Sequence, residues 1–124
     1  MKSSSTIDEY KSMRGYLKKK SPTMLKGFQK RFFMIVNDGS IMAWCDDESV
    51  SAKPKGSIEI HDIEGIKRTG STDFEIKYAG RSFVLRAENE SERERWIKGL
   101  NGLQDHLNKQ EDIRNKIWVL CFIS

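Results

Sequence analysis

The sequence is poor in residues that cross-link a chain, ligate metals or break strands, with two cysteines, two histidines and two prolines in 124 residues. Cys45 and Cys121 are far apart and lack metal-like neighbours, so neither a zinc motif nor a disulfide framework is visible, and a reducing, cytoplasmic setting is expected. His61 and His106 lie near no motif cysteine or serine. Because no nucleophile–base pair or metal cluster can be assembled, we expect no enzyme, no cofactor and no metal.

Long apolar runs are also missing. No stretch approaches the about 20 apolar residues that span a bilayer, and the polar N-terminus is not a secretory signal. The formal net charge is +4 and the sequence pI is near 9.1. This mildly basic balance suits an anionic partner such as a lipid headgroup, whereas nucleic-acid-binding proteins concentrate more charge on one face. We therefore expect no nucleic acid as a partner.

Short strands follow a polar leader over residues 1–12. Phe74, Ile76 and Tyr78 alternate with polar neighbours, and this period of two is typical of half-buried antiparallel strands. Gly39, in a hairpin turn, is free to adopt a positive φ. The pattern predicts seven strands, over residues 14–20, 28–36, 41–45, 57–60, 65–69, 73–78 and 81–87.

One amphipathic helix is expected after the strands, from Ser91 to about Lys109. Ser91 and Glu94 have capping-box spacing, and an apolar stripe follows them. Glycines in this stretch, Gly99 and Gly102, are expected to allow close approach to a sheet. The predicted fold is mainly β: a bent seven-stranded antiparallel sheet or open barrel, capped by the helix. We expect one domain over 13–109 and a C-terminal tail over 110–124, and a monomer.

Two motifs resemble a known family. The stretch Gly-Tyr-Leu-Lys-Lys-Lys at 15–20, followed by Lys-Gly-Phe-Gln-Lys-Arg-Phe-Phe-Met-Ile at 26–35, resembles the opening hairpin of pleckstrin homology (PH) domains. Glu94-Arg95-Trp96-Ile97 resembles the tryptophan-bearing final helix of the same family. The resemblance covers residues 14 to about 107. It implies a bent seven-stranded sheet capped by one helix, in agreement with the strand and helix patterns.

Strand parity indicates a binding site. Lys19 shares a face with Leu17, and Gln29 and Arg31 share one with Phe33, so these polar residues continue an inward-facing row to the mouth of the barrel. Two cations in one mouth favour a phosphate ligand. The resemblance implies that role for Lys19 and Arg31, which fall on the family's phosphate-binding lysine and arginine. The alternative is a solvated basic hairpin with no ligand preference.

The lipid preference is indicated by a departure from the family pattern. Family members selective for the triply phosphorylated inositol lipid usually carry a second basic residue where Gln29 stands, and often a tyrosine near Ala43. The hairpin is most similar to those of oxysterol-binding and ceramide-transfer proteins, which implies a monophosphorylated or weakly discriminated phosphoinositide. Further candidate headgroup ligands are Gln29, Lys18, Lys53 and Lys55, of which the last two are equally explained as solvated residues.

The loop between the first two strands suits a membrane surface. Met24 and Leu25 form an apolar pair flanked by Lys20 and Lys26, so that methylenes could enter the acyl boundary while charges meet headgroups. The alternative is that the apolar pair folds back over the barrel.

The C-terminal residues Cys121-Phe122-Ile123-Ser124 match the C-a-a-X prenylation pattern if Ser124 is the natural end, and the serine favours farnesyl. The alternatives are a truncated chain, or a tail that packs on the domain and keeps Cys121 inert.

Two functions remain open from the sequence. The first is a phosphoinositide-binding module that recruits the protein, as a peripheral membrane protein, to the cytosolic face of membranes. The second is a signalling adaptor that binds a protein partner and has weak, non-specific affinity for anionic lipids.

Overall fold

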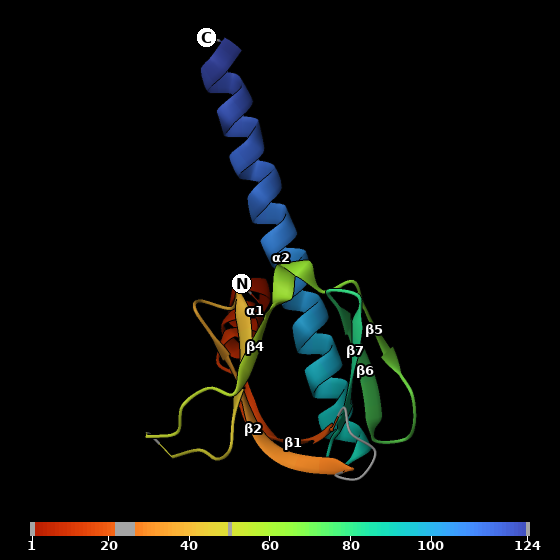
Figure 1. The fold of residues 1–124 in the computed structure, drawn as a ribbon. Helices are drawn as coiled ribbons and strands as arrows, with labels where there is room; N and C mark the ends of the chain where they lie inside the picture. Colours follow the sequence, from red (N-terminus) through yellow and green to blue (C-terminus); the bar gives the residue numbers. More distant parts are fainter. Residues whose placement is uncertain (1, 22–26, 50, 124) are drawn as a thin grey trace.

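Seven antiparallel strands form one bent, open sheet in the computed structural model, which describes residues 2–21, 27–49 and 51–123 (Figure 1). The strand order is β4-β3-β2-β1-β7-β6-β5, so the edges β4 and β5 are left unjoined. The expected mainly-β fold with a capping helix is confirmed. The elements are α1 (Lys2–Lys11), β1 (Arg14–Lys20), β2 (Phe28–Val36), β3 (Ile41–Cys45), β4 (Gly56–Glu59), the 3-10 helix η1 (Ile60–Asp62), β5 (Gly65–Arg68), β6 (Asp73–Tyr78), β7 (Arg81–Arg86) and α2 (Glu90–Ile123).

The strand bounds agree with the sequence patterns to within one residue. The β2–β3 turn takes three left-handed residues in succession, with φ of 53° at Asn37, 57° at Asp38 and 86° at Gly39. Glycine is required at the third because a Cβ there would lie 2.8 Å from Cγ of Lys11. This close approach fixes the turn against the end of α1.

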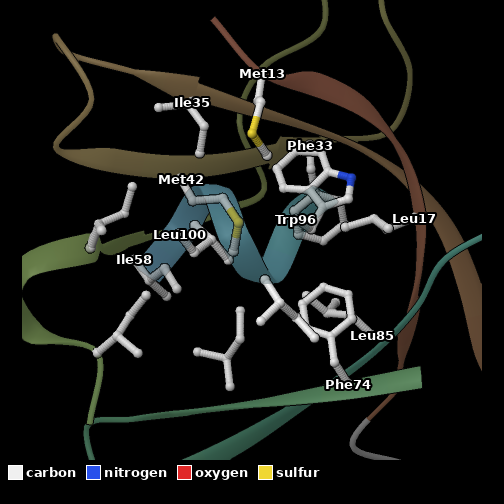
Figure 2. Close-up of a cluster of buried hydrophobic side chains, with 14 of the residues drawn as sticks. Met13, Leu17, Phe33, Ile35, Met42, Ile58, Phe74, Leu85, Trp96 and Leu100 are labelled. Atoms are coloured by element: carbon white, nitrogen blue, oxygen red, sulfur yellow. The ribbon is translucent and has the colours of Figure 1, made fainter. Parts of the chain in front are cut away.

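The core lies between the bent sheet and the first half of α2. Figure 2 shows Trp96 and Leu100 of α2 among side chains from several strands, with Phe33 beside the indole. The Phe33 and Trp96 rings are 6.5 Å apart in an edge-on arrangement, and Trp96 is fully buried. The apolar stripe predicted from helical spacing is therefore the face of α2 that closes the barrel.

Helix α2 begins earlier and ends later than the sequence pattern predicted. The side-chain oxygen of Asn89 accepts a hydrogen bond of 2.8 Å from the Glu92 amide, so Asn89, and not Ser91, caps the helix. At the other end, α2 continues past Lys109 to Ile123, through most of the expected tail. Residues 104–123 contain neither glycine nor proline, so no stop signal interrupts the helix.

A short helix, α1, forms where a loose leader was expected. Tyr10 packs against the core and Met13 is part of it. A Cβ at Gly102 would lie 2.5 Å from Cε2 of Tyr10, and one at Gly99 would overlap the sulfur of Met13. The two glycines thus make room for this N-terminal segment and not for the sheet, and α1 packs against α2.

Beyond the core, α2 projects away from the sheet (Figure 1). Nε2 of His61, in η1, lies 2.6 Å from the Glu111 carboxylate and so connects the domain to this part of α2. No helix within the described residues is long and apolar enough to cross a membrane.

Candidate anion-binding mouth

Lys19 occupies the centre of the candidate site. It lies opposite Gln29 on β2 and Leu85 on β7, with its Nζ 5.5 Å from the Trp44 ring centroid and 5.3 Å from the Phe83 centroid. Burial lowers the pKa of its ammonium, and the charges of Arg81 and Arg31 lower that pKa further. Both guanidinium groups therefore lie close enough to Lys19 to disfavour its charge, and the three side chains form a cationic cluster. This cluster, with its two aromatic walls, is called the mouth below.

Arg31 is held in place by its own strand. Its Nη2 donates a hydrogen bond of 3.0 Å to Oε1 of Gln29, and its Nη1 donates one of 2.8 Å to the Lys30 carbonyl. Arg31 lies on the same face of the β1–β2 hairpin as Lys19, and its charge lowers the Lys19 pKa. Gln29, predicted as a direct ligand, uses its acceptor oxygen to orient the guanidinium.

Asp46 adds an acidic group that the sequence analysis did not identify. Its Oδ1 lies 3.7 Å from Nε of Arg31 and 3.4 Å from Nζ of Lys55. The pairing arises because Asp46 directly follows β3, next to the strand that carries Arg31, while the Lys55 amide bonds back to the Trp44 carbonyl at 2.8 Å. Lys55 is therefore paired with a carboxylate that also contacts Arg31, and its role as a headgroup ligand stays a prediction.

Arg81 is a second residue that the sequence analysis missed. It begins β7, directly after a turn with positive φ at Ala79 and Gly80. Its guanidinium lies 5.6 Å from the Phe83 centroid. Its approach to Lys19 depends on the pairing of β7 with β1, which no local sequence pattern predicts. A cavity of about 100 Å³ runs here, lined by Lys19, Lys20, Ser21, Arg81, Ser82, Phe83 and Val84.

Lys18 lies away from the mouth. It alternates with Lys19 along β1 and lines a separate cavity of about 480 Å³ on the other face, together with Lys30 and Arg86. There Arg86 stacks 3.9 Å from the Phe28 centroid and donates to Asp73 at 2.8 and 3.1 Å. The hydrogen bonds from Arg86 lower the pKa of the Asp73 carboxyl.

The remaining predicted site residues fall into three groups. Lys20 lines the cavity beside Arg81, and Lys53 is exposed in the β3–β4 loop. The apolar loop residues and their lysine, Met24, Leu25 and Lys26, lie outside the described residues. Cys121 is exposed on α2, and its farnesylation stays a prediction.

Known proteins resemble the chain over this same region. The family model for the PH domain matches residues 11–105. Human Arf-GAP with Rho-GAP domain, ANK repeat and PH domain-containing protein 2 is 35% identical over 83 residues, which are 67% of this chain and 5% of that protein. The chain therefore spans a small part of this much longer relative.

Solved structures match the fold. The PH domain of human oxysterol-binding protein-related protein 11 superposes with a TM-score of 0.68 at 28% identity, covering 77% of this chain and 81% of that one. The C-terminal PH domain of pleckstrin, solved with an inositol pentakisphosphate, gives a TM-score of 0.61 at 24% identity over 72% of this chain and 93% of that one. The strand order, the capping helix with Trp96 and the family match over residues 11–105 agree, and the chain belongs to the PH domain family.

Proposed function

We propose that the mouth binds the phosphorylated headgroup of an inositol lipid and thereby recruits the chain to the cytosolic face of a membrane. PH domains are modules that often bind phosphoinositides and mediate membrane or protein interactions. The observation that carries the proposal is a cluster of three cations: Lys19 and Arg81 line one cavity beside the Phe83 ring, and Arg31 lies on the same face of the β1–β2 hairpin as Lys19. A phosphate there would relieve their mutual repulsion and accept hydrogen bonds from all three.

Typical interaction free energies favour a bound phosphate over Asp46 as the partner of these cations. An exposed ion pair such as that of Asp46 contributes about 0.2–1 kcal/mol. Each hydrogen bond from a charged group to a buried phosphate contributes about 1.5–3 kcal/mol. A headgroup that contacts two or three cations would therefore displace Asp46, which is 61% exposed and free to turn toward solvent.

A singly phosphorylated or weakly discriminated headgroup fits this mouth best. Gln29 brings no charge, and Asp46 neutralises part of Arg31 and Lys55. Fewer uncompensated cations remain for a second and third phosphate. Pleckstrin's C-terminal domain, with its inositol pentakisphosphate, supports inositol phosphates as the ligand class for this architecture.

The test is sedimentation with vesicles that each contain one phosphoinositide, comparing the native chain with Lys19→Ala/Arg31→Ala. The matched control is Lys77→Ala/Lys98→Ala, which removes two exposed lysines elsewhere on the domain. Lipid-dependent pelleting should fall at least about tenfold in the first variant, since each lost contact to a charged group costs roughly 1.5–3 kcal/mol, and should change little in the control. Equal losses in both variants would reduce the interaction to bare charge attraction.

A protein-binding adaptor is the second candidate, favoured by the same neutralisation of Arg31 and Lys55 by Asp46. If it is correct, the native chain should pellet weakly and equally with every anionic vesicle.

A further inference from the structure

The distal end of α2 exposes large apolar side chains on every side. Ile117, Trp118, Val119 and Leu120 are 57, 63, 52 and 64% exposed. Consecutive residues of a helix point about 100° apart, so these four cover its whole circumference. We call residues 117–120 the helix tip.

A second copy of the chain fits the helix tip poorly. A partner helix covers one stripe, and a stable coiled coil needs at least about three heptads of such a stripe. The polar residues 108–112 interrupt any stripe between Leu107 and Ile113. Pairing through the tip alone would leave Trp118 or Val119 in water and bury little area.

Lipid acyl chains, in contrast, surround a helix on all sides. The charged residues within the turn before the tip, Arg114 and Lys116, are both cationic and would face anionic headgroups. Trp118 stands at the boundary between the polar and apolar parts, the position that tryptophan favours at membrane interfaces. The apolar run over 117–123 is about 10 Å long, which reaches the boundary between headgroups and acyl chains.

We propose that the helix tip inserts into the headgroup–acyl boundary of an anionic membrane, as a second membrane contact that does not depend on the mouth. The occupant is a lipid surface and not a protein partner. The tip and the mouth belong to different parts of the chain, so each can be removed while the other is left intact.

The experiment uses phosphatidylcholine vesicles that contain phosphatidylserine and no phosphoinositide. Sedimentation is compared for the native chain, Ile117→Gln/Leu120→Gln at the tip, and Lys19→Ala/Arg31→Ala at the mouth. The tip variant should lose about tenfold in vesicle affinity, whereas the mouth variant should keep most of it. Circular dichroism and thermal melts check that all three chains are folded.

Tryptophan fluorescence supplies a second readout, because Trp118 is exposed, whereas Trp96 is fully buried and Trp44 is half-buried beside Lys19. Vesicles should shift the emission to shorter wavelength, and lipids brominated near the headgroup should quench it. Trp118→Phe should keep the binding and lose the signal.

Three outcomes would overturn the proposal. Insertion is excluded if the native chain does not sediment with these vesicles. It is also excluded if the tip variant binds them as tightly as the native chain. Light scattering that shows a dimer lost in the tip variant, without vesicle binding, would assign the tip to a second copy. Loss of phosphoinositide binding in the mouth variant bears on the mouth alone.

Discussion

The Asp46 carboxylate lies 3.7 Å from Nε of Arg31, so it competes for the guanidinium that the proposed headgroup phosphate would contact. Because the same oxygen is 3.4 Å from Nζ of Lys55, one acidic side chain compensates two cations, Arg31 and Lys55. A ligand must replace this internal anion.

Asp46→Asn should therefore strengthen phosphoinositide binding by about two- to fivefold, which corresponds to the loss of one or two weak exposed ion pairs. Titration calorimetry with a soluble inositol phosphate measures the change. Asp47→Asn is the matched control, since it removes the same charge one residue away and its oxygen can still accept the 2.8 Å hydrogen bond from the Ser49 amide. Equal gains in both variants would mean that net charge, and not the position of Asp46, controls affinity.

The pKa of Lys19 should report ligand binding. Burial lowers it first, and Arg81 and Arg31 lower it further, so the charged amine costs the fold stability at neutral pH. That cost fades as the pH rises through the folded-state pKa toward the ordinary value of 10.5. Arg81→Gln should raise the Lys19 pKa, and a bound inositol phosphate should raise it more. Carbon NMR of methylated lysines measures the Lys19 pKa in the variant and with the ligand. If the ligand leaves the Lys19 pKa unchanged, it binds elsewhere.

Acid should weaken the ion pair between Asp73 on β6 and Arg86 on β7. Because hydrogen bonds from Arg86 lower the Asp73 pKa, this pair stabilises the fold above the ordinary carboxyl value of 3.8, and the stabilisation is lost as the pH falls through the lowered pKa. Asp73→Asn should cost about 0.5–1 kcal/mol at neutral pH, a range reduced for the exposure of the pair. Urea unfolding at several pH values tests this, and the gap between the two chains should close in strong acid.

The contact between Tyr10 and Gly102 should determine whether Gly102→Ala lowers or raises the stability of the domain. In the native chain, Gly102→Ala places a methyl group 2.5 Å from the Tyr10 ring and should destabilise the domain by about 1 kcal/mol after the gain in helix propensity is subtracted. In a Tyr10→Ala background, the clash is gone and the same change should stabilise by up to about 1 kcal/mol. Urea denaturation of the four chains gives the coupling energy. Additive effects would show that α1 does not rest on α2 in solution.

Much of the fold was predictable because it depends on local periodicity. Phe74, Ile76 and Tyr78 alternate, so β6 could be placed from the sequence, and Trp96 with Leu100 marked the buried face of α2. The end of α2 was missed because the expected boundary at Lys109 rested on where the apolar stripe stops. No glycine or proline follows Lys109, so the sequence carries no helix stop signal there.

Half of the mouth was predictable for a similar local reason. Lys19 and Arg31 belong to one hairpin, and parity within two paired strands places both on the inner face. Asp46 and Arg81 come from the ends of other strands, and their approach depends on how the sheet bends.

The sequence by itself determined the strands, the capping helix and the inward row of Lys19 and Arg31, because hydrophobic alternation and steric propensity act between near neighbours. Tertiary structure alone decided that Asp46 pairs with Arg31, that Arg81 lies near Lys19 and that the Tyr10 ring packs against Gly102. These contacts join segments far apart in the chain, and their geometry follows from the closure of the whole sheet around one core.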